Sequence, residues 1–208
     1  MFSQSVRAYV RGFAAAAACA AAFIPVAALA DDAGSYSCPV LGSKVESITK
    51  DTLHSDYKGV RYYFCCGSCK PDFDKNPAKF LKDSKTKGKV VGGSLFDPIT
   101  TIRIDPKKAV SKSEFNGVRY FFAKADGKDL FDKDSRKYAI APDKELLFCP
   151  ISDEVVSSYE KASDYSDVKG TRYYFCCAGC KPKFDKDPGK YLENIDARIK
   201  AAQGKESR

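Results

Sequence analysis

The chain reads KGVRYYFCCGSCKP at residues 58–71 and, 111 residues further on, KGTRYYFCCAGCKP at residues 169–182. The similarity extends on both sides of this stretch, since 24 of the 44 residues from 38 to 81 are identical to their counterparts from 149 to 192, without a gap. Self-similarity at a fixed spacing is typical of a chain built from repeated structural units. The sequence therefore contains a duplication, and both copies have the cysteine pattern C-x(26)-C-C-x(2)-C.

A third, middle copy lies between these two outer copies. Residues 116–122, NGVRYFF, repeat the aromatic segment, and residues 131–138 repeat the segment that follows the last cysteine. Asp97-Pro98 stands where the outer copies begin with Cys-Pro, and the other cysteine positions are taken by Ala123, Lys124 and Gly127. We interpret what the middle copy keeps, above all the aromatic residues, as part of the fold. The cysteines, which it lacks, indicate a special chemistry of the outer copies.

Each outer copy has the signals of a β-hairpin followed by short helices. A Lys-Gly pair is typical of a hairpin turn, and the Tyr and Phe residues after it are typical of a strand. The small residues inside C-x(2)-C allow a tight turn, and Pro71 and Pro182 suit the first turn of a helix. Asn76-Pro77 and Asp187-Pro188 each provide an N-cap followed by proline, so we expect a second short helix there. The sequence predicts an α+β fold of three tandem small modules, each a hairpin with one or two short helices.

Polar segments separate the copies and set the expected boundaries. These segments are residues 85–89 and Gly92-Gly93-Ser94 between the first two copies, and residues 141–144 between the last two. The predicted parts are a signal peptide at 1–30, module 1 at 31–84, a degenerate module 2 without cysteines at 95–140, module 3 at 145–194 and a polar C-terminal tail at 195–208. Because units of about fifty residues bury little apolar surface, we expect the modules to form one continuous body.

The first thirty residues are typical of a secretory signal peptide. Two arginines precede an apolar run from residue 13 to 29, which ends with Ala28-Leu29-Ala30. We expect cleavage after Ala30, a periplasmic or secreted location, and no membrane attachment after cleavage. An uncleaved anchor helix is the alternative, and Pro25 within an alanine-rich run that is barely long enough to span a membrane argues against it.

The composition excludes several classes of protein. Hydrophobic residues make up 44% and charged residues 30% of the chain, which excludes a disordered tail and a multi-pass membrane protein. The net charge is +8, or +6 without the two arginines of the signal, and lysines are interspersed with aspartates along the whole length. This mixture predicts a solvated surface, with no nucleic acid as partner. With no paired carboxylates, no phosphate loop and a single histidine, His54, expected in a solvent-facing loop, we predict that the protein is not an enzyme.

Four thiols in each outer copy match the number of ligands in a closed tetrahedral zinc site. The candidate ligands are Cys38, Cys65, Cys66 and Cys69 in the first copy and Cys149, Cys176, Cys177 and Cys180 in the last. Adjacent cysteines point in different directions, so we expect at least three thiols to converge in each copy and leave the fourth open. Ligation needs the thiolate, and we expect the helix N-terminus with Lys70 or Lys181 to lower the thiol pKa values. An all-sulfur set favours soft ions such as zinc, copper(I), cadmium or mercury over magnesium or calcium.

Disulfide bonding is the main alternative, because an exported protein meets an oxidising compartment and the eight cysteines of the mature chain are an even number. Joining the neighbours Cys65 and Cys66 to each other would form a strained ring, which argues against that pair. A mixed behaviour stays open, with metal bound when the thiols are reduced and disulfides formed when they are oxidised. A thiol oxidoreductase is disfavoured, because the C-x(2)-C motif lacks the βαβ surroundings of a thioredoxin.

At these residues the chain resembles the YHS and TRASH group of small metal-binding domains, which are treble-clef-like relatives of zinc fingers. The resemblance rests on Cys38-Pro39-Val40, residues 57–59, residues 62–66, Cys69, Phe73 and residues 76–80, and on their counterparts from Cys149-Pro150-Ile151 to residues 188–191. It implies treble-clef-like modules that bind a heavy metal through Cys38, Cys65 and Cys69 and through Cys149, Cys176 and Cys180, with Cys66 and Cys177 as candidate fourth ligands. Domains of this family occur in proteins proposed to sense, traffic or resist metals and are found attached to metal pumps. A metal transporter or another metal-handling protein is therefore an expected partner.

Together these features predict an exported, non-enzymatic protein whose outer modules each hold one zinc or copper(I) ion through cysteine thiolates. The expected role is metal trafficking, storage or resistance. The alternative is a structural or interaction protein whose cysteines form disulfides or fixed structural zinc sites.

Overall fold

The computed structural model describes residues 35–45, 47–83 and 86–206. The predicted signal peptide and its cleavage point after Ala30 lie outside these residues. Within them, no helix is both long enough and apolar enough to cross a membrane.

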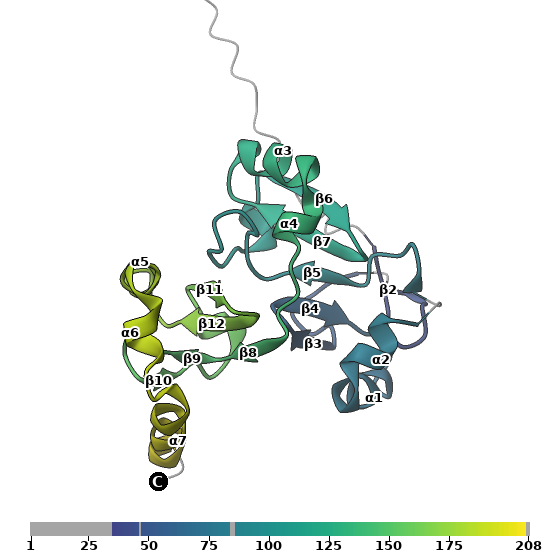
Figure 1. Cartoon of the computed structure of the whole chain (residues 1–208). Coiled ribbons are helices and arrows are strands. Elements are labelled where there is room, and N and C mark those ends of the chain that lie inside the picture. The colour runs from purple at the N-terminus through teal and green to yellow at the C-terminus, as the bar shows by residue number, and fades with distance from the viewer. Residues whose placement is uncertain (1–34, 46, 84–85, 207–208) are drawn as a thin grey trace, which may run out of the picture.

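Three β-hairpins, each followed by two short helices, make up most of the described chain (Figure 1). The hairpins are β3 (His54–Tyr57) with β4 (Val60–Tyr63), β6 (Ser111–Phe115) with β7 (Val118–Phe122), and β11 (Asp164–Val168) with β12 (Thr171–Phe175). The helix pairs are α1 (Cys69–Lys75) with α2 (Pro77–Leu81), α3 (Ala125–Lys133) with α4 (Ser135–Tyr138), and α5 (Cys180–Lys186) with α6 (Pro188–Leu192). The expectation of a mixed α+β fold with small sheets and short helices is confirmed.

The hairpin turns follow from the two residues at each tip. In the first hairpin Lys58 and Gly59 have φ angles of 51° and 73°, so both lie in the left-handed region that a two-residue turn requires. Asn116-Gly117 and Lys169-Gly170 have the same conformation in the other two hairpins. Glycine adopts this conformation without strain, which is why each turn has it at the second position.

Each helix pair is divided by a capping residue at the predicted place. The side chain of Asn76 accepts a hydrogen bond from the backbone N–H of Lys79 and so caps α2, and Asp187 caps α6 through the N–H of Lys190. Asp134 does the same for α4. The first helix of each outer copy begins at its last cysteine, Cys69 or Cys180, so the proline that follows lies in its first turn.

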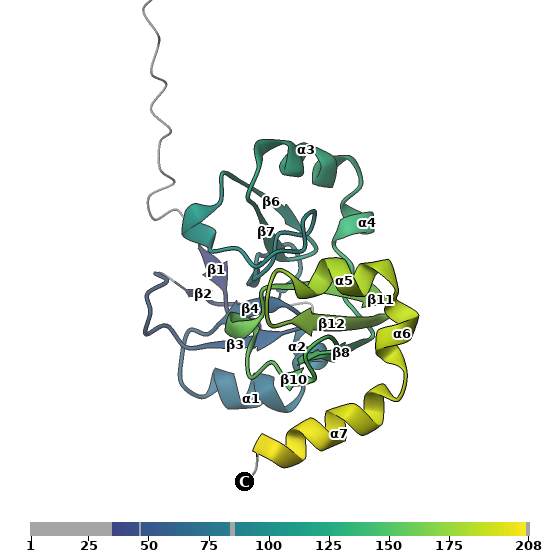
Figure 2. The same ribbon diagram turned by 90° about the vertical axis from the view of Figure 1, so that its left-hand side faces the viewer.

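The first two hairpins share one five-stranded sheet of order β3-β4-β5-β7-β6, with α1 and α3 at opposite ends of it (Figures 1 and 2). Its central strand, β5 (Gly92–Ser94), is a segment expected to be a linker, and that expectation is wrong. A Cβ atom on Gly92 would lie 2.7 Å from Val60 Cγ1, and one on Gly93 would lie 2.8 Å from the Tyr36 hydroxyl oxygen. The two glycines are therefore what lets neighbouring strands and a tyrosine approach this closely.

The third hairpin forms a separate sheet of order β11-β12-β8, in which β8 (Lys144–Leu146) runs parallel to β12. Phe96, from the segment after β5, packs against Tyr165 and Tyr174 of this sheet, with ring centroids 5.4 and 5.5 Å apart. An ion pair of 2.9 Å between Arg61 and Glu160 also joins the first hairpin to the C-terminal copy. The three hairpins thus form one connected body.

One fully buried phenylalanine lies at the centre of each helix–hairpin core: Phe73, Phe131 or Phe184. Phe73 contacts the rings of Tyr62, Phe64 and Phe80, and Phe184 makes the equivalent contacts. Phe131 keeps the two contacts to the second hairpin strand, with Tyr120 and Phe122, and packs against Phe115 as well. Since the middle copy keeps this arrangement without any cysteine, the aromatic core holds each hairpin against its helix independently of the thiols.

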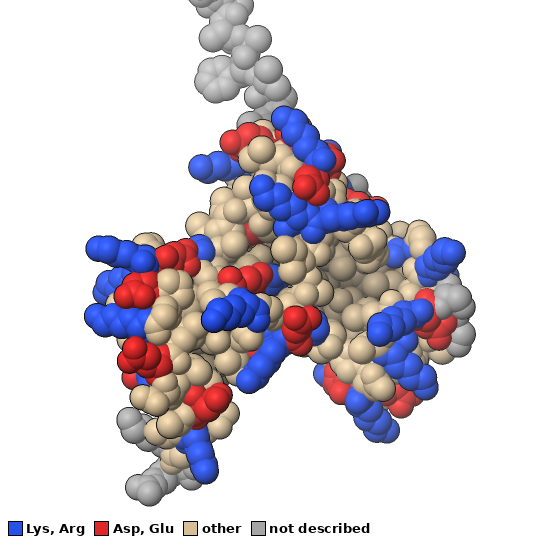
Figure 3. All heavy atoms as spheres, viewed as in Figure 1, with Lys and Arg blue, Asp and Glu red and all other residues tan. Residues whose placement is uncertain are grey.

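The C-terminal segment, which the sequence indicated only as a polar tail, is helical over most of its length. Residues Ile195–Glu206 form a twelve-residue helix, α7, which contacts the short strand β10 (Glu154–Val155). On the face shown in Figure 3, basic and acidic side chains are interspersed, as the mixed charge pattern predicts.

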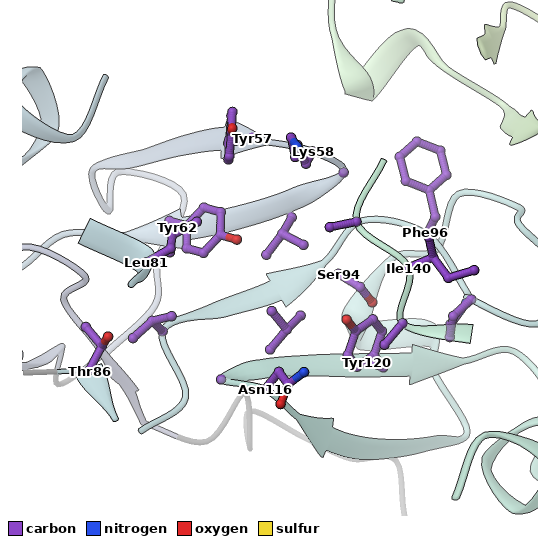
Figure 4. A pocket seen from close by; sticks show the side chains of 18 of the residues that line it. Tyr57, Lys58, Tyr62, Leu81, Thr86, Ser94, Phe96, Asn116, Tyr120 and Ile140 are labelled. Atoms are coloured by element: carbon purple, nitrogen blue, oxygen red, sulfur yellow. The ribbon is translucent and has the colours of Figure 1, made fainter. Parts of the chain in front are cut away.

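A cavity of about 850 Å³ opens between the hairpins (Figure 4). Tyr62 of β4, Ser94 of β5 and Tyr120 of β7 contribute to its wall, together with Phe96. None of the described residues that line it is a cysteine, so this cavity is separate from the cysteine clusters.

Candidate metal centres

The leading cysteine of each outer copy lies in a tight turn between two very short strands. Cys38 follows β1 (Tyr36–Ser37) and precedes β2 (Lys44–Val45), and Cys149 ends β9 (Phe148–Cys149), which pairs with β10. The carbonyl of Cys38 accepts a 2.7 Å hydrogen bond from Gly42, and that of Cys149 accepts one of 3.0 Å from Asp153. Both cysteines are fully buried, so the turn presents each thiol to the interior.

The remaining cysteines lie where the second hairpin strand passes into a helix. Cys65 and Cys66 follow β4, and Cys69 is the first residue of α1. The backbone N–H of Cys69 donates to the carbonyl of Cys66 at 3.3 Å, which closes the C-x(2)-C segment into a turn. Cys176, Cys177 and Cys180 repeat this arrangement after β12, with a corresponding bond of 3.1 Å.

Three thiols converge in each outer copy. The Sγ atoms of Cys38, Cys65 and Cys69 all lie within 4.8 Å of one another, and so do those of Cys149, Cys176 and Cys180. Sulfur ligands about 2.3 Å from a tetrahedral zinc ion lie about 3.8 Å apart. The Sγ atoms of Cys176 and Cys180 are 3.9 Å apart, so their separation fits joint ligation of one ion.

Cys66 and Cys177 lie beside these triads and are not part of them. The Sγ of Cys66 is 3.0 Å from that of Cys69 and 3.3 Å from the Ser68 hydroxyl, and Cys177 is likewise 3.0 Å from Cys180. All eight cysteines of the described residues are free thiols. The structure thus gives each site three convergent thiols and one neighbour.

A nest of backbone N–H groups surrounds the leading thiol. Burial opposes ionisation of Cys38, but hydrogen bonds from the backbone of Cys65, Leu41 and Val40 together lower its pKa. The pKa of Cys149 is lowered in the same way: burial opposes ionisation, while the Ser152 hydroxyl and three backbone N–H groups outweigh it. The leading thiol of each triad is therefore the one placed to carry negative charge.

The middle copy fills the same nest with a carboxylate. Asp97 is 1% exposed, and its Oδ1 accepts from the N–H of Ile99 at 2.8 Å and of Thr100 at 3.3 Å, while Oδ2 accepts from Ala123 at 3.0 Å. These three donors correspond in sequence to Val40, Leu41 and Cys65. Sequence reasoning noted Asp97-Pro98 in place of Cys-Pro but missed this role. The comparison indicates that the position is built for an anion.

The other two thiols of each triad have raised pKa values, contrary to the expectation that they would be lowered. Burial raises the pKa of Cys65 to about 11, and burial with hydrogen bonds to Cys66 and Cys38 raises that of Cys69 further. The same causes raise the pKa values of Cys176 and Cys180, whereas hydrogen bonds from Ser68 and Cys69 lower that of Cys66 to about 7. A cation bound by a whole triad must therefore displace protons from it.

Lys70 and Lys181 do not supply the expected charge to the thiols. The ammonium group of Lys70 donates instead to Ser55 Oγ and to Asp74, both at 2.8 Å, and Ser55 donates to Asp74 at 2.5 Å. Lys181, Ser166 and Asp185 make the same cluster in the C-terminal copy. The middle copy keeps its Ser113–Asp132 and Lys128–Asp132 contacts, so this clamp between hairpin and helix belongs to the fold. Sequence reasoning missed it.

His54 belongs to neither triad. It is the first residue of β3 and half-buried, with Nδ1 3.0 Å from the carbonyl oxygen of Thr52, and the expectation of a solvent-facing loop residue is wrong. Its imidazole therefore interacts with the neighbouring backbone and not with a cysteine triad.

The model of the YHS domain family matches the chain at residues 37–84 and again at residues 158–194. The first match includes a whole triad, and the second includes Cys176 and Cys180. The middle copy is not matched. No curated protein and no solved structure matches the chain significantly.

Proposed function

From the two YHS domains that this chain carries, each with a cysteine triad, we propose that it binds one soft metal ion per outer copy as cargo. The observation that supports this most directly is the pairing of three convergent thiols with a nest of N–H donors around the leading one. Where the cysteines are absent, Asp97 occupies that nest as a fixed anion. The N–H donors can therefore be satisfied by an anion without any metal. The three thiols around one point are what is suited to hold a metal ion.

The three thiols of a triad have distinct roles in this proposal. Cys38 is the buried first ligand, and the backbone N–H groups around it lower its pKa. Cys69 is a second buried ligand, at the start of α1. Cys65 is exposed, so it is the ligand through which an ion enters or leaves. Zinc prefers four ligands, which leaves one position for a water molecule or for a thiol of another molecule.

We assign the protein to metal trafficking, storage or resistance outside the cytoplasm, with zinc or copper(I) as the ion. The apolar N-terminal run after two arginines supports export. The all-thiol triads support a soft ion. A metal transporter or another metal-handling protein is the proposed partner, and no catalytic role is proposed.

Metal analysis of protein purified without oxygen tests this function. The wild type is expected to carry two ions per chain and to titrate eight free thiols after chelation. Changing the leading ligands together, Cys38→Ser with Cys149→Ser, should abolish stoichiometric binding. The matched control, Cys66→Ser with Cys177→Ser, should keep two ions, because these thiols lie outside the triads. Wild-type protein that binds no zinc or copper(I) would refute the proposal.

A structural role with disulfides is the second candidate, and the 3.0 Å separations of Cys66 from Cys69 and of Cys177 from Cys180 favour it. It predicts bridged cysteines and no bound metal in protein kept under mild oxidation and then desalted without reductant. It also predicts that reduction alone lowers the stability of the outer copies, which the metal-cargo proposal does not.

A further inference from the structure

The turn that carries Cys149 is held by the C-terminal helix. Arg198 of α7 donates from Nη2 to the carbonyl of Pro150 at 2.5 Å and from Nε to the carboxylate of Asp153 at 2.8 Å. Its Nη1 donates to the carbonyl of Tyr191 at 2.7 Å, in the last turn of α6. One guanidinium thus joins the metal-site turn, α6 and α7. Figures 1 and 2 both show α7 running past β10.

Asp153 lies at a position of the turn where the backbone is in the left-handed conformation. Its φ angle is 59°, in the left-handed region, and its counterpart in the N-terminal copy is Gly42, with a φ of 70°. Glycine adopts this conformation freely, whereas aspartate is strained there, although less than most residues. The C-terminal copy therefore has a carboxylate at this position, where the N-terminal copy has glycine and the middle copy has Thr101 with a φ of 61°, and Arg198 binds this carboxylate.

A second difference lies at the thiols themselves. Ser152 Oγ is 3.4 Å from Cys176 Sγ. Its counterpart in the N-terminal copy is Leu41, which is 53% exposed and whose side chain has no hydrogen-bonding group. Cys176 is half-buried, whereas the corresponding Cys65 is exposed. The N-terminal turn is held from another direction, by Lys89, whose ammonium donates to the carbonyl of Gly42 at 2.8 Å.

We infer that the two sites are not equivalent: the C-terminal site retains its ion, while the N-terminal site exchanges its ion readily. This inference rests on the proposed function. After the exposed ligand has let go, complete release still requires the buried leading cysteine to detach from the ion, and in the C-terminal site Arg198 holds the turn that carries this cysteine. Arg198 is thus a positioning residue that acts through the turn, and Ser152 adds a contact between the turn and the Cys176 thiol there.

Release of zinc to an excess of a chromogenic chelator tests the inference on the full chain. Cys38→Ser with Cys65→Ser leaves the C-terminal site alone, and Cys149→Ser with Cys176→Ser leaves the N-terminal site alone. Because hydrogen bonds to a charged group are among the stronger ones, we expect release from the C-terminal site to be about tenfold slower. Adding Arg198→Ala should remove this difference and leave the N-terminal rate unchanged. Lys200→Ala, on an exposed residue of the same helix, is the matched control and should change neither rate.

Two further measurements keep the test valid if Arg198→Ala unfolds α7. Ser152→Leu, which installs the N-terminal residue, should speed release from the C-terminal site with α7 intact. Amide hydrogen exchange should show α7 becoming more protected when the C-terminal site is loaded with zinc, since coupling between ion and helix is reciprocal.

Equal release rates from the two sites overturn the inference, and so does an unchanged C-terminal rate in Arg198→Ala. Both results leave the proposed function intact, because two ions are still bound. Failure of both single-site variants and of the wild type to bind either zinc or copper(I) refutes the proposed function itself.

Discussion

Replacing Asp97 with alanine should destabilise the protein more than the same replacement of a hydrogen-bonded aspartate on the surface. Asp97 is the buried anion of the middle copy, and its carboxylate accepts from three backbone N–H groups at 2.8, 3.0 and 3.3 Å. The alanine variant leaves Ile99, Thr100 and Ala123 without that acceptor. The turn after β5 would then be detached from the end of β7.

The magnitude follows from the strength of these bonds. A hydrogen bond to a charged group contributes about 1.5–3 kcal/mol, and the cost of burying the carboxylate offsets part of the sum. We expect the free energy of unfolding to fall by about 3–4 kcal/mol, a large fraction of the 5–15 kcal/mol typical of a domain. Asp97→Asn keeps one acceptor oxygen and should lose about half as much.

Urea unfolding of reduced, metal-free protein measures the effect. With a dependence of about 2 kcal/mol per molar urea, the midpoint should fall by about 1.5–2 M in Asp97→Ala. Asp105→Ala is the matched control, because Asp105 is exposed and accepts one bond, from Lys107 at 3.0 Å, at the start of the short 3-10 helix η2 (Pro106–Lys108). That variant should lose only about 1 kcal/mol. Equal losses in the two variants would refute the reasoning that the nest is a buried anion site.

Three further predictions concern residues outside the nest. Cys66→Ser with Cys177→Ser should keep the metal affinity within about tenfold of the wild type in a competition titration, because neither thiol belongs to a triad; a hundredfold loss would make them ligands. Burial raises the pKa of Asp164 to about 6, so its neutral form favours the folded state, and this contribution to stability is present below about pH 4 and lost as pH rises through 6. Asp164→Asn should therefore raise the thermal midpoint of metal-free protein at pH 7 but not at pH 3.5, and a shift that is the same at both values would contradict this. Gly92→Ala should cost about 1–3 kcal/mol in urea unfolding, because its Cβ would lie 2.7 Å from Val60 Cγ1 and 2.9 Å from the Arg61 carbonyl oxygen, whereas Gly67→Ala, with nothing within 4 Å, should be nearly neutral.

Local signals in the sequence were sufficient to predict the hairpins and the breaks between the paired helices. A Lys-Gly or Asn-Gly turn and an Asn-Pro or Asp-Pro cap each act within four residues, so their structure can be predicted from the sequence alone. The duplication made it predictable that at least three thiols converge in each outer copy, whereas the choice of Cys38, Cys65 and Cys69 came from the resemblance to YHS and TRASH domains.

The elements that sequence reasoning missed depend on residues far apart in the chain. Gly92-Gly93-Ser94 has the composition of a linker, and it becomes a central strand only because β4 and β7 lie on either side of it. Residues 195–206 have little apolar periodicity, so nothing in the segment itself indicated that Arg198 binds a turn 45 residues earlier. The Ser55–Lys70–Asp74 clamp likewise joins a strand to a helix, and its three residues are not adjacent in sequence.

The three copies offer two solutions to one structural problem, which is how to hold a tight turn against the end of a hairpin strand. The middle copy uses the carboxylate of Asp97, which bridges the turn and the backbone of Ala123 permanently. The outer copies place thiols there, and a neutral thiol is a weaker hydrogen-bond partner than a carboxylate. A protein that needed only stability could have used aspartate in all three copies, since Phe73, Phe131 and Phe184 form the same core with or without cysteines. The thiols of the outer copies therefore replace a permanent bridge by a site suited to bind and release a soft cation. In the C-terminal copy the Arg198 contacts hold the same turn from another side, against α6 and α7.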